Sequence, residues 1–324
     1  MSELFQPKKR IIGLSPMAGV TNSIYRSICS EMGSGFNVTE MISDKGLLYE
    51  NKKTFDMIKL EKNATPLAIQ LFGSSADTIL LAAKLLLTKE KPDAIDINMG
   101  CPVNKVIKSG AGSALLKEPL KVYEIVKSLK ENIDIPITIK IRAGFDHQHI
   151  NCDEVTRQAT KAGVDAITIH GRTRSDMYHG VVNKEYIKMV RENTDCYVFG
   201  NGDITSGVTA KQMFDETGVN GIMIGRAAMG NPWIFKEINS YLADNDYISP
   251  SKEEIIMKML EHAKRLIATD GERYAMIQMR THAAWYFKLL PMSKKYRSEV
   301  VLVSSYEDLE RIAMRYLNEE KKYI

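Results

Sequence analysis

Eight short apolar stretches, separated by helical or polar segments, limit the fold of this chain more than any other feature. Most of them are continuously hydrophobic rather than alternating, as expected of strands that are covered on both faces. Eight such strands with intervening helices over about 230 residues predict a (β/α)8 TIM barrel of the α/β class. The predicted strands are 11–17, 36–41, 66–72, 94–98, 136–141, 166–170, 197–200 and 221–224. Helical patterns between them cover 74–89, 120–132, 152–162 and 205–217.

A doubly wound parallel sheet is the alternative arrangement of the same elements. Folds of that kind that bind dinucleotides carry the sequence G-x-G-x-x-G between a strand and a helix. The string SGAGSAL, which ends at Leu115, is only loosely similar, because it does not directly follow a strand and has Leu115 in place of the third Gly. The sequence therefore favours the barrel.

The pattern changes near residue 240, where the strands cease. A polar connector over 244–250 leads to Ser251 and Glu254, which have the spacing of a capping box at a helix start. Only helical patterns follow, over 251–269, 272–290 and 304–319. We predict a barrel domain over residues 1–240 and a C-terminal all-helical domain over residues 241–324.

The composition limits the classes of protein to which this chain can belong. Its four cysteines are scattered without a C-x-x-C pair, which argues against a zinc site, an iron–sulfur cluster and a disulfide framework. The N-terminus lacks an apolar signal core, and no run of about 18 apolar residues could span a membrane. The net charge of +4 does not by itself indicate nucleic acid. We expect a cytoplasmic protein, monomeric and without a bound metal.

Polar residues stand at the carboxyl ends of the predicted strands, where barrels hold their active sites. The segment Asp-Ile-Asn-Met-Gly-Cys-Pro places Asn98 at the end of a strand and Cys101 just beyond it. Most free cysteines are buried packing residues, so Cys101 alone is weak evidence of catalysis. Lys, Arg and His are costly to bury in apolar strands unless they serve a partner. Together, Lys140, Arg142 and His170 therefore predict an anionic or polar ligand.

Glycines after the last two strands lie where barrels often bind a phosphate through backbone N–H groups. They also fit tight turns, but Arg226 directly after Gly225 adds a guanidinium that can form two hydrogen bonds to a phosphate. With Lys140 and the amides of Gln70 and Asn98, these residues describe a site for a flat phosphorylated cofactor, and FMN fits it. The predicted cofactor-binding residues are Pro16, Met17, Ala18, Gln70, Lys140, His170, Asn201, Gly202, Asp203, Gly225 and Arg226.

Seven segments of the barrel carry a family pattern: LSPMAGVTNSIYR (14–26), QLFGS (70–74), DINMGCPVNKVIKSGAGSALL (96–116), IKIRAGFD (139–146), IHGRTR (169–174), GNGDI (200–204) and GIMIGRAAMGNPWIF (221–235). In this order they resemble the tRNA-dihydrouridine synthases, FMN-dependent enzymes that reduce uridine to 5,6-dihydrouridine. The continuation after Gly-Cys-Pro is most similar to the bacterial B-type branch. One position departs from the family pattern T-R-x-Q-x-Y-x-G, since Asp176 replaces the Gln while Tyr178 and Gly180 are kept.

The resemblance implies a mechanism in which reduced flavin gives a hydride to C6 of a uracil in the tRNA D-loop. C5 is then protonated from the opposite face, and Cys101 is the implied catalytic acid, because a thiol is largely protonated at neutral pH. Asn98 and Arg142 are implied to hold the uracil edge, and Lys140 and His170 to serve flavin and substrate. NADPH, or NADH, would reduce the flavin again. Similarity to the B-type branch hints at position 17 of the D-loop.

A basic segment of the helical domain indicates a polyanionic partner. Residues 273–298 include six Lys or Arg and no Asp or Glu, with aromatic residues interleaved. Cations for phosphates and rings for base stacking are typical of RNA binders. A solvated basic face above an aromatic core gives the same pattern. The string RTHAAWY resembles the tRNA-binding domain of the family, so Arg280, His282 and Lys288 are predicted to contact tRNA.

Two other functions stay open at this point. An FMN barrel could oxidise or reduce a free pyrimidine, as the dihydroorotate dehydrogenases do, although those barrels lack a helical tail of this kind. A tRNA-binding protein with an inactive barrel is the other alternative. The presence of Cys101, Lys140 and His170 argues against that second alternative.

Overall fold

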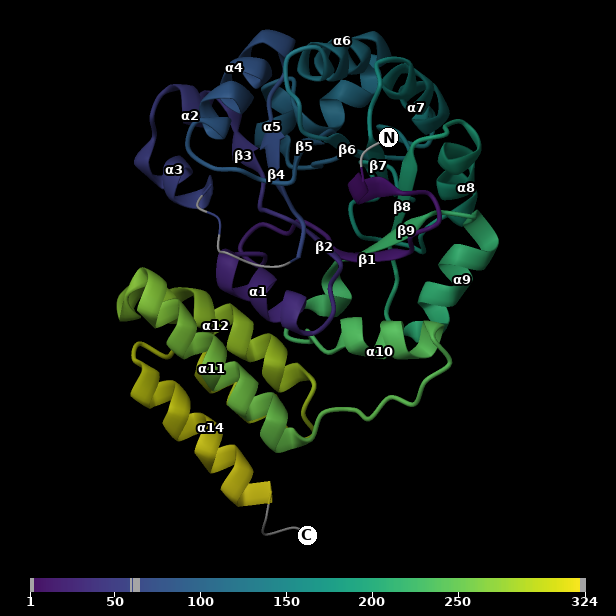
Figure 1. The fold of residues 1–324 in the computed structure, drawn as a ribbon. Helices are drawn as coiled ribbons and strands as arrows, with labels where there is room; N and C mark the ends of the chain where they lie inside the picture. Colours follow the sequence, from purple (N-terminus) through teal and green to yellow (C-terminus); the bar gives the residue numbers. More distant parts are fainter. Residues whose placement is uncertain (1–2, 59, 61–64, 321–324) are drawn as a thin grey trace.

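The fold is a closed barrel of parallel strands, with helices around it and a group of further helices against one side (Figure 1). We describe residues 3–58, 60 and 65–320 from a computed structural model. The barrel closes because the first strand pairs with the last strand and the second one, and the second strand pairs with the fourth. This confirms the predicted TIM barrel. The strands are β1 (Ile11–Leu14), β2 (Phe36–Val38), β3 (Ile42–Ser43), β4 (Leu67–Phe72), β5 (Ala94–Asn98), β6 (Ile137–Arg142), β7 (Ala166–His170), β8 (Tyr197–Asn201) and β9 (Gly221–Ile224).

The predicted second strand, 36–41, is shorter in the structure. Residues 36–38 form β2, which pairs with β1 and β4, and the two-residue β3 at 42–43 lies beyond the predicted range and pairs with β4. Between them, the Thr39 hydroxyl accepts a hydrogen bond from the Gln70 N–H at 3.0 Å. A side chain thus takes the place of a backbone partner, and the ladder breaks where an apolar run alone predicts continuity.

The helices of the barrel include all four that the sequence predicts. Pro119 occupies the first turn of α6, where its missing N–H costs nothing. Helices that the sequence did not predict, such as α5, are mostly short, and short helices have little periodicity to detect. The barrel helices are α1 (Ser23–Glu31), α2 (Asp44–Leu48), α3 (Lys52–Ile58), α4 (Ala76–Leu87), α5 (Asn104–Lys108), α6 (Pro119–Lys130), α7 (Cys152–Lys161), α8 (Lys184–Glu192), α9 (Gly207–Thr217) and α10 (Ile234–Leu242).

An aromatic cluster closes the amino-terminal end of the barrel. Phe5, from the segment before β1, packs edge-on against Phe36 and Phe199, which stack on each other with ring centroids 5.7 Å apart. Tyr197 joins the cluster, and its hydroxyl donates to the carbonyl of Lys9 at 2.7 Å. Since this end is filled with buried rings, the carboxyl ends of the strands are the end left for a site.

Up to residue 320, where the described part of the chain ends, the C-terminal region contains helices and no strands, as the sequence predicts. Ser251 and Glu254 form the predicted capping box at the start of the first helix. The expected boundary at residue 240 lies two residues before the end of α10, and a connector without regular structure follows. The helices are α11 (Lys252–Asp270), α12 (Glu272–Lys288), α13 (Lys294–Val300) and α14 (Tyr306–Glu320).

The C-terminal helices pack against α1 of the barrel (Figure 1). Arg265 on α11 donates to Glu31 and to Ser27 on α1, both at 2.6 Å. Asn22, the N-cap of α1, donates to Gln278 on α12 at 2.9 Å. These contacts connect the two parts of the molecule through polar groups at the edge of a buried core.

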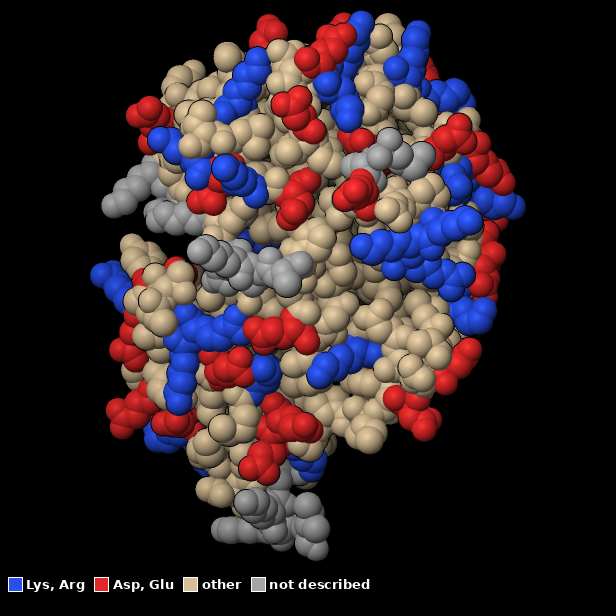
Figure 2. All heavy atoms as spheres, in the orientation of Figure 1, with Lys and Arg blue, Asp and Glu red and all other residues tan. Residues whose placement is uncertain are grey.

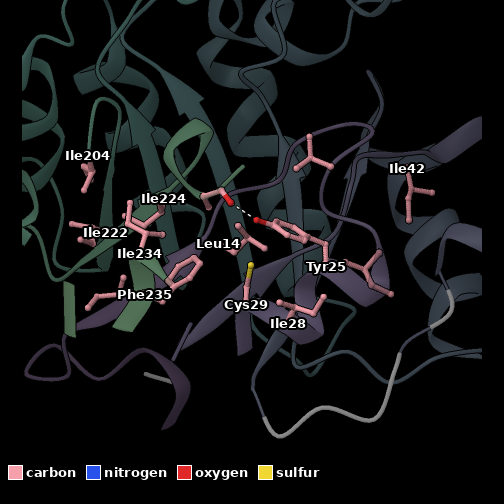
Figure 3. Close-up of a cluster of buried hydrophobic side chains, with 14 of the residues drawn as sticks. Leu14, Tyr25, Ile28, Cys29, Ile42, Ile204, Ile222, Ile224, Ile234 and Phe235 are labelled. Atoms are coloured by element: carbon pink, nitrogen blue, oxygen red, sulfur yellow. Dashed lines mark hydrogen bonds between the residues drawn. The ribbon is translucent and has the colours of Figure 1, made fainter. Parts of the chain in front are cut away.

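Tyr25 lies at the centre of the core between α1 and the barrel (Figure 3). Its side chain is fully buried with Leu14 and Ile28, and its hydroxyl donates to the carbonyl of Ala228 just after β9. The ring of Tyr25 also packs against His262 of α11 and His282 of α12. One tyrosine therefore belongs to both the barrel core and the junction between the barrel and the C-terminal helices.

Candidate active site

The register of the barrel places the predicted polar residues on adjoining strands. Asn98 of β5 is paired with Lys140 of β6, and Arg142 at the end of β6 is paired with His170 of β7. His170 is in turn paired with Asn201 of β8. Residues separated by up to about a hundred positions in the chain thus meet at one end of the barrel. The structure brings this part of the predicted site together.

Cys101 lies at this mouth with its thiol almost fully enclosed. The residue is 8% exposed and packs with Val106 and Ala111. Its N–H donates to Asn98 Oδ1 at 2.8 Å, and its carbonyl accepts from the Ser113 N–H at 3.1 Å. Burial raises the pKa of the Cys101 thiol, against smaller opposing effects that include the charges of Arg142 and Lys140. The group at this position is therefore a protonated thiol at neutral pH.

The amides of Gln70 and Asn98 form hydrogen bonds with other protein groups. Asn98 Nδ2 donates to Gln70 Oε1 at 2.9 Å, and Gln70 Nε2 donates to Asp96 Oδ2 at 2.6 Å. Asp96 also accepts from the Thr138 hydroxyl, and burial raises the pKa of its carboxyl. The sequence analysis missed Asp96, although a carboxylate inside an apolar strand is a signal of such a network. Asn98 holds the backbone of the Cys101 loop through its Oδ1. This role is additional to its predicted contact with substrate.

Lys140 is a cation on β6 beside Asn98 and Asn201. Its Nζ donates to Asn201 Oδ1 at 3.3 Å, while Asn201 Nδ2 donates to the Met223 carbonyl at 2.6 Å. Burial and the charge of Arg142 lower the pKa of Lys140 to about 8, although Asp96 and Cys101 oppose this effect. Lys140 is therefore a cation at neutral pH that gives up its proton more readily than an ordinary lysine.

His170 is neutral at this mouth. Its side chain is buried, and Nε2 lies 3.3 Å from Arg172 Nη1. Burial lowers the pKa of His170 well below its ordinary value, and the charges of Lys140, Arg142, Arg172 and Arg226 add to the effect. The imidazole can accept or donate a hydrogen bond here, but it does not add to the positive charge.

Arg142 forms hydrogen bonds to the protein backbone in addition to its predicted contact with substrate. It is only 3% exposed and donates to three backbone carbonyls: Nε to Gly100 at 2.9 Å, and Nη1 to Thr173 and Met177 at 2.8 Å each. The prediction that this guanidinium holds a uracil edge does not account for these bonds. Arg142 ties the Cys101 loop to the loop after β7, because carbonyls in both loops lie within its reach.

Asp203 also forms protein contacts that its predicted role in cofactor binding did not include. Arg172, which is 2% exposed, donates to both of its carboxylate oxygens, at 3.0 and 2.7 Å. The Val182 N–H and Arg226 donate to the same carboxylate at 2.9 and 3.2 Å. Asp203 is therefore the counter-ion of a buried arginine. Local spacing does not predict the pair of Arg172 and Asp203, because the partners lie 31 residues apart.

Open space near Gly225 provides the best fit for a phosphorylated cofactor. A Cβ built at Gly225 would meet only Met17 Sδ, at 4.0 Å, so a ligand can approach the backbone there. Gly202 differs, since a Cβ would strike Val182 at 2.7 Å and His170 at 2.9 Å. Protein side chains thus fill the space beside Gly202 that is open beside Gly225. Arg226 is half exposed beside this space.

The three predicted cofactor-binding residues that follow β1 are at least partly accessible to solvent. Pro16 and Met17 are half-buried, and Ala18 is exposed just after β1. The Arg226 guanidinium lies 5.0 Å from the ring centroid of Tyr178. The residues present therefore fit FMN: backbone and a guanidinium for its phosphate, and Lys140 for negative charge on its ring.

The C-terminal helices present fewer of the predicted RNA-binding groups than the sequence suggested. Lys288 is exposed, and Arg280 is half-buried with Nε donating to the Val303 carbonyl at 2.9 Å. His282 is fully buried, so its predicted contact with tRNA is wrong. The physical reason is helical phase: His282 lies on the face of α12 that packs against Tyr25 of the barrel.

The aromatic residues of α12 and α13 mostly belong to the core. Tyr286, Phe287 and Tyr296 are buried, and Phe287 stacks on Tyr296 with ring centroids 5.7 Å apart. Only Tyr274 among the predicted stacking rings is largely exposed, while Trp285 is half-buried. Figure 2 shows acidic and basic side chains interspersed over the C-terminal helices on the face drawn. In residues 273–298, an anion can therefore contact exposed Lys and Arg side chains, whereas most of the aromatic rings are buried.

Two further observations concern metals and membranes. In the parts of the chain that the structure describes, no group of three or more His, Cys, Asp or Glu side chains is arranged to hold a metal ion. No helix among those residues is both long and apolar enough to cross a membrane.

Comparison with known proteins decides the family. Residues 13–320 match the model of the dihydrouridine synthase (Dus) family. The chain belongs to the dihydrouridine synthase family. This confirms the resemblance seen in the sequence and makes the protein a member of an enzyme family.

Relatives in this family extend over nearly the whole chain. The tRNA-dihydrouridine synthase B of Pseudomonas putida is 38% identical over 88% of this chain and 85% of its own. The synthases B of Klebsiella pneumoniae and Escherichia coli K12 are 34% and 36% identical, over 97% and 88% of this chain and 98% and 88% of their own. The barrel also resembles histamine dehydrogenase from Rhizobium sp. 4-9, with a TM-score of 0.54 and 15% identity over 71% of this chain and 45% of that one. At that identity the likeness concerns the fold alone.

Asp176, the departure from the dihydrouridine synthase pattern, has a clear structural role. Its Oδ2 accepts from both the N–H and the hydroxyl of Thr173, each at 2.8 Å. Its Oδ1 lies 2.7 Å from His147 Nε2. The carboxylate thus stabilises the loop after β7 by binding Thr173 in that loop and His147 in the segment after β6.

Proposed function

We propose that this protein reduces uridine to 5,6-dihydrouridine in the D-loop of tRNA, using FMN and NADPH or NADH. The observation that carries the proposal is a protonated, enclosed thiol, Cys101, at a barrel mouth that also holds Lys140 and neutral His170. Membership of the dihydrouridine synthase family and similarity to enzymes named tRNA-dihydrouridine synthase B support it.

The cofactor site in this proposal extends from β1 to β9. Gly225 and Arg226 would hold the FMN phosphate, and Met17 would lie beside it. Lys140 would stabilise negative charge on the flavin ring, since it is a half-buried cation at neutral pH. When bound, FMN supplies the hydride that reduces the C5–C6 bond of the uracil.

Cys101 is the acid in this proposal. Reduction of the pyrimidine double bond leaves negative charge that must be met by a proton at C5, and a neutral thiol can donate it. Asn98 Oδ1 and the Arg142 guanidinium hold the peptide group between Gly100 and Cys101, the first through its N–H and the second through its carbonyl. His170 stays neutral, so it can accept or donate a hydrogen bond to the flavin or the substrate without competing for the proton.

We propose that residues 241–324 bind the tRNA and that residues 1–240 contain the catalytic site. Lys288 and Arg280 are the cations of α12 that would meet its phosphates, and the binding should weaken steeply with salt. We expect the protein to act as a monomer in the cytoplasm. Position 17 of the D-loop is the target that similarity to the synthase B enzymes favours.

Replacing Cys101 by Ala tests the assignment of the acid. The variant should bind flavin and be reduced by NADPH like the parent protein, because neither step uses the thiol. Dihydrouridine formation on unmodified tRNA should fall by about 10²- to 10⁴-fold, the usual contribution of a general acid. Cys196→Ala, a change at a cysteine outside the mouth, is the matched control and should keep full activity. Full activity of Cys101→Ala would exclude the assignment.

The same preparation separates the two alternative functions. A purified protein without a flavin spectrum after supplying FMN would favour a tRNA-binding protein with an inactive barrel. NADPH oxidation driven by free uracil or orotate, and not by unmodified tRNA, would favour an enzyme that acts on a free pyrimidine.

A further inference from the structure

Arg142 connects the loop that carries Cys101 to the loop that follows β7. Its Nε donates to the Gly100 carbonyl at 2.9 Å, one residue before the thiol. Its Nη1 donates to the carbonyls of Thr173 and Met177. Because the side chain is buried and its bonds are directed, the position of the Gly100 carbonyl depends on where these two carbonyls lie.

Asp176 determines where those carbonyls lie. Its carboxylate closes the turn from Thr173 to Met177 by accepting two hydrogen bonds from Thr173, whose side chain is fully buried. The opposite oxygen binds His147, on the segment after β6. The Arg174 and Ser175 N–H groups donate to the carbonyls of Gly144 and Phe145 in that segment, at 2.9 and 3.1 Å.

We propose that Asp176 is a positioning residue for Cys101, acting through the turn of residues 173–177 and the Arg142 guanidinium. The effect on turnover rests on the proposed function, but the effect on the thiol does not. The carboxylate accepts three hydrogen bonds at once, two from Thr173 and one from His147. A Gln at this position, as in the family pattern, has one acceptor oxygen, so the arrangement depends on the residue that this chain carries.

The thiol itself reports on this arrangement. The charges of Arg142 and Lys140 lower the pKa of Cys101 and oppose the effect of burial. If the turn loosens and Arg142 moves away, one of these charges no longer acts on the thiol, and its pKa rises further. Asp176 itself acts at a distance, through its pairing with Thr173 and His147.

The test measures how fast iodoacetamide alkylates Cys101 as a function of pH, with the modified peptide identified by mass spectrometry. In Asp176→Ala the midpoint of the alkylation profile should shift upward by about half a pH unit or more. Asp176→Asn keeps one acceptor oxygen and should give a smaller shift in the same direction. In turnover, Asp176→Ala should lower kcat with tRNA about tenfold and leave flavin reduction by NADPH unchanged.

His149→Ala is the matched control, because His149 pairs with Asp146 on the same segment without reaching Arg142. Its alkylation profile should equal that of the parent protein. A profile for Asp176→Ala and Asp176→Asn that also equals the parent's would overturn the inference. If Asp176→Ala does not fold, Asp176→Asn alone decides. If the parent protein forms no dihydrouridine, the proposed function is contradicted. The alkylation profiles still test the positioning role of Asp176 in that case.

Discussion

The barrel mouth and the junction between the barrel and the C-terminal helices both contain buried histidines that stay neutral for different reasons. At the mouth, four neighbouring cations add to the effect of burial on the pKa of His170. At the junction, burial alone lowers the pKa of His282 to about 3, and His262 is lowered mainly by burial as well. The rings of these two histidines lie 4.6 Å apart, and both contact Tyr25.

The difference shows how the same side chain can serve two purposes. The cations around His170 make the mouth suitable for an anionic ligand, and several of them are held by directed hydrogen bonds to carbonyls and carboxylates. At the junction, His262 of α11 and His282 of α12 are buried rings that pack against Tyr25 of α1. Protonation of any of these three histidines would oppose folding, because each has a folded pKa below that of the unfolded chain, and at the mouth it would also change the charge of a site.

The largest effect that we expect is acid destabilisation from the junction. His262 and His282 have folded pKa values below those of the unfolded chain, so the unfolded state binds more protons as the pH falls. Their contribution is complete above about pH 6.5 and is lost below it, by about 2 kcal/mol for each histidine from about pH 7 to about pH 5. Urea unfolding at these two pH values measures the loss.

His282→Phe should make this loss smaller by about 2 kcal/mol, because a ring of similar shape remains and the titrating group is removed. His147→Ala, at an exposed histidine, should leave most of the loss in place. An unfolding free energy that is the same at both pH values would contradict the account of the junction.

The next effect concerns the buried ion pair at the mouth. Arg172→Met removes one partner and leaves Asp203 without its main counter-ion, so the unfolding free energy should fall by about 3 kcal/mol. Arg226→Met removes the half-exposed partner of the same carboxylate and should cost no more than about 1 kcal/mol. Equal losses for the two variants would show that burial does not distinguish these pairs.

The smallest effect lies on the exposed side of α12. Lys288→Ala should weaken tRNA binding about threefold and lower the slope of log K against log salt by about one, as for one lost phosphate contact. The flavin spectrum and the stability should not change. Lys211→Ala, at an exposed lysine of the barrel helix α9, is the control. Equal tRNA binding by all three proteins would exclude Lys288 from the interface.

Sequence patterns predicted the strands better than they predicted the partners of the site residues. All eight strand positions and the location of Cys101, Lys140 and His170 at strand ends follow from local periodicity, which a buried parallel strand imposes on its own residues. The break at Thr39 and the burial of His282 do not follow, because each depends on a contact with a different element.

The sequence by itself therefore determined the barrel, the residues at its mouth and the family, since these depend on the order and spacing of residue types along the chain. Only the tertiary structure decided that Arg142 binds carbonyls of two loops, that Asp203 neutralises Arg172, and that Asp176 shapes the turn beside them. Hydrogen-bond partners are chosen by distance in space. In this barrel, loops about 30 to 70 residues apart in the chain meet at one end, where their polar groups satisfy one another.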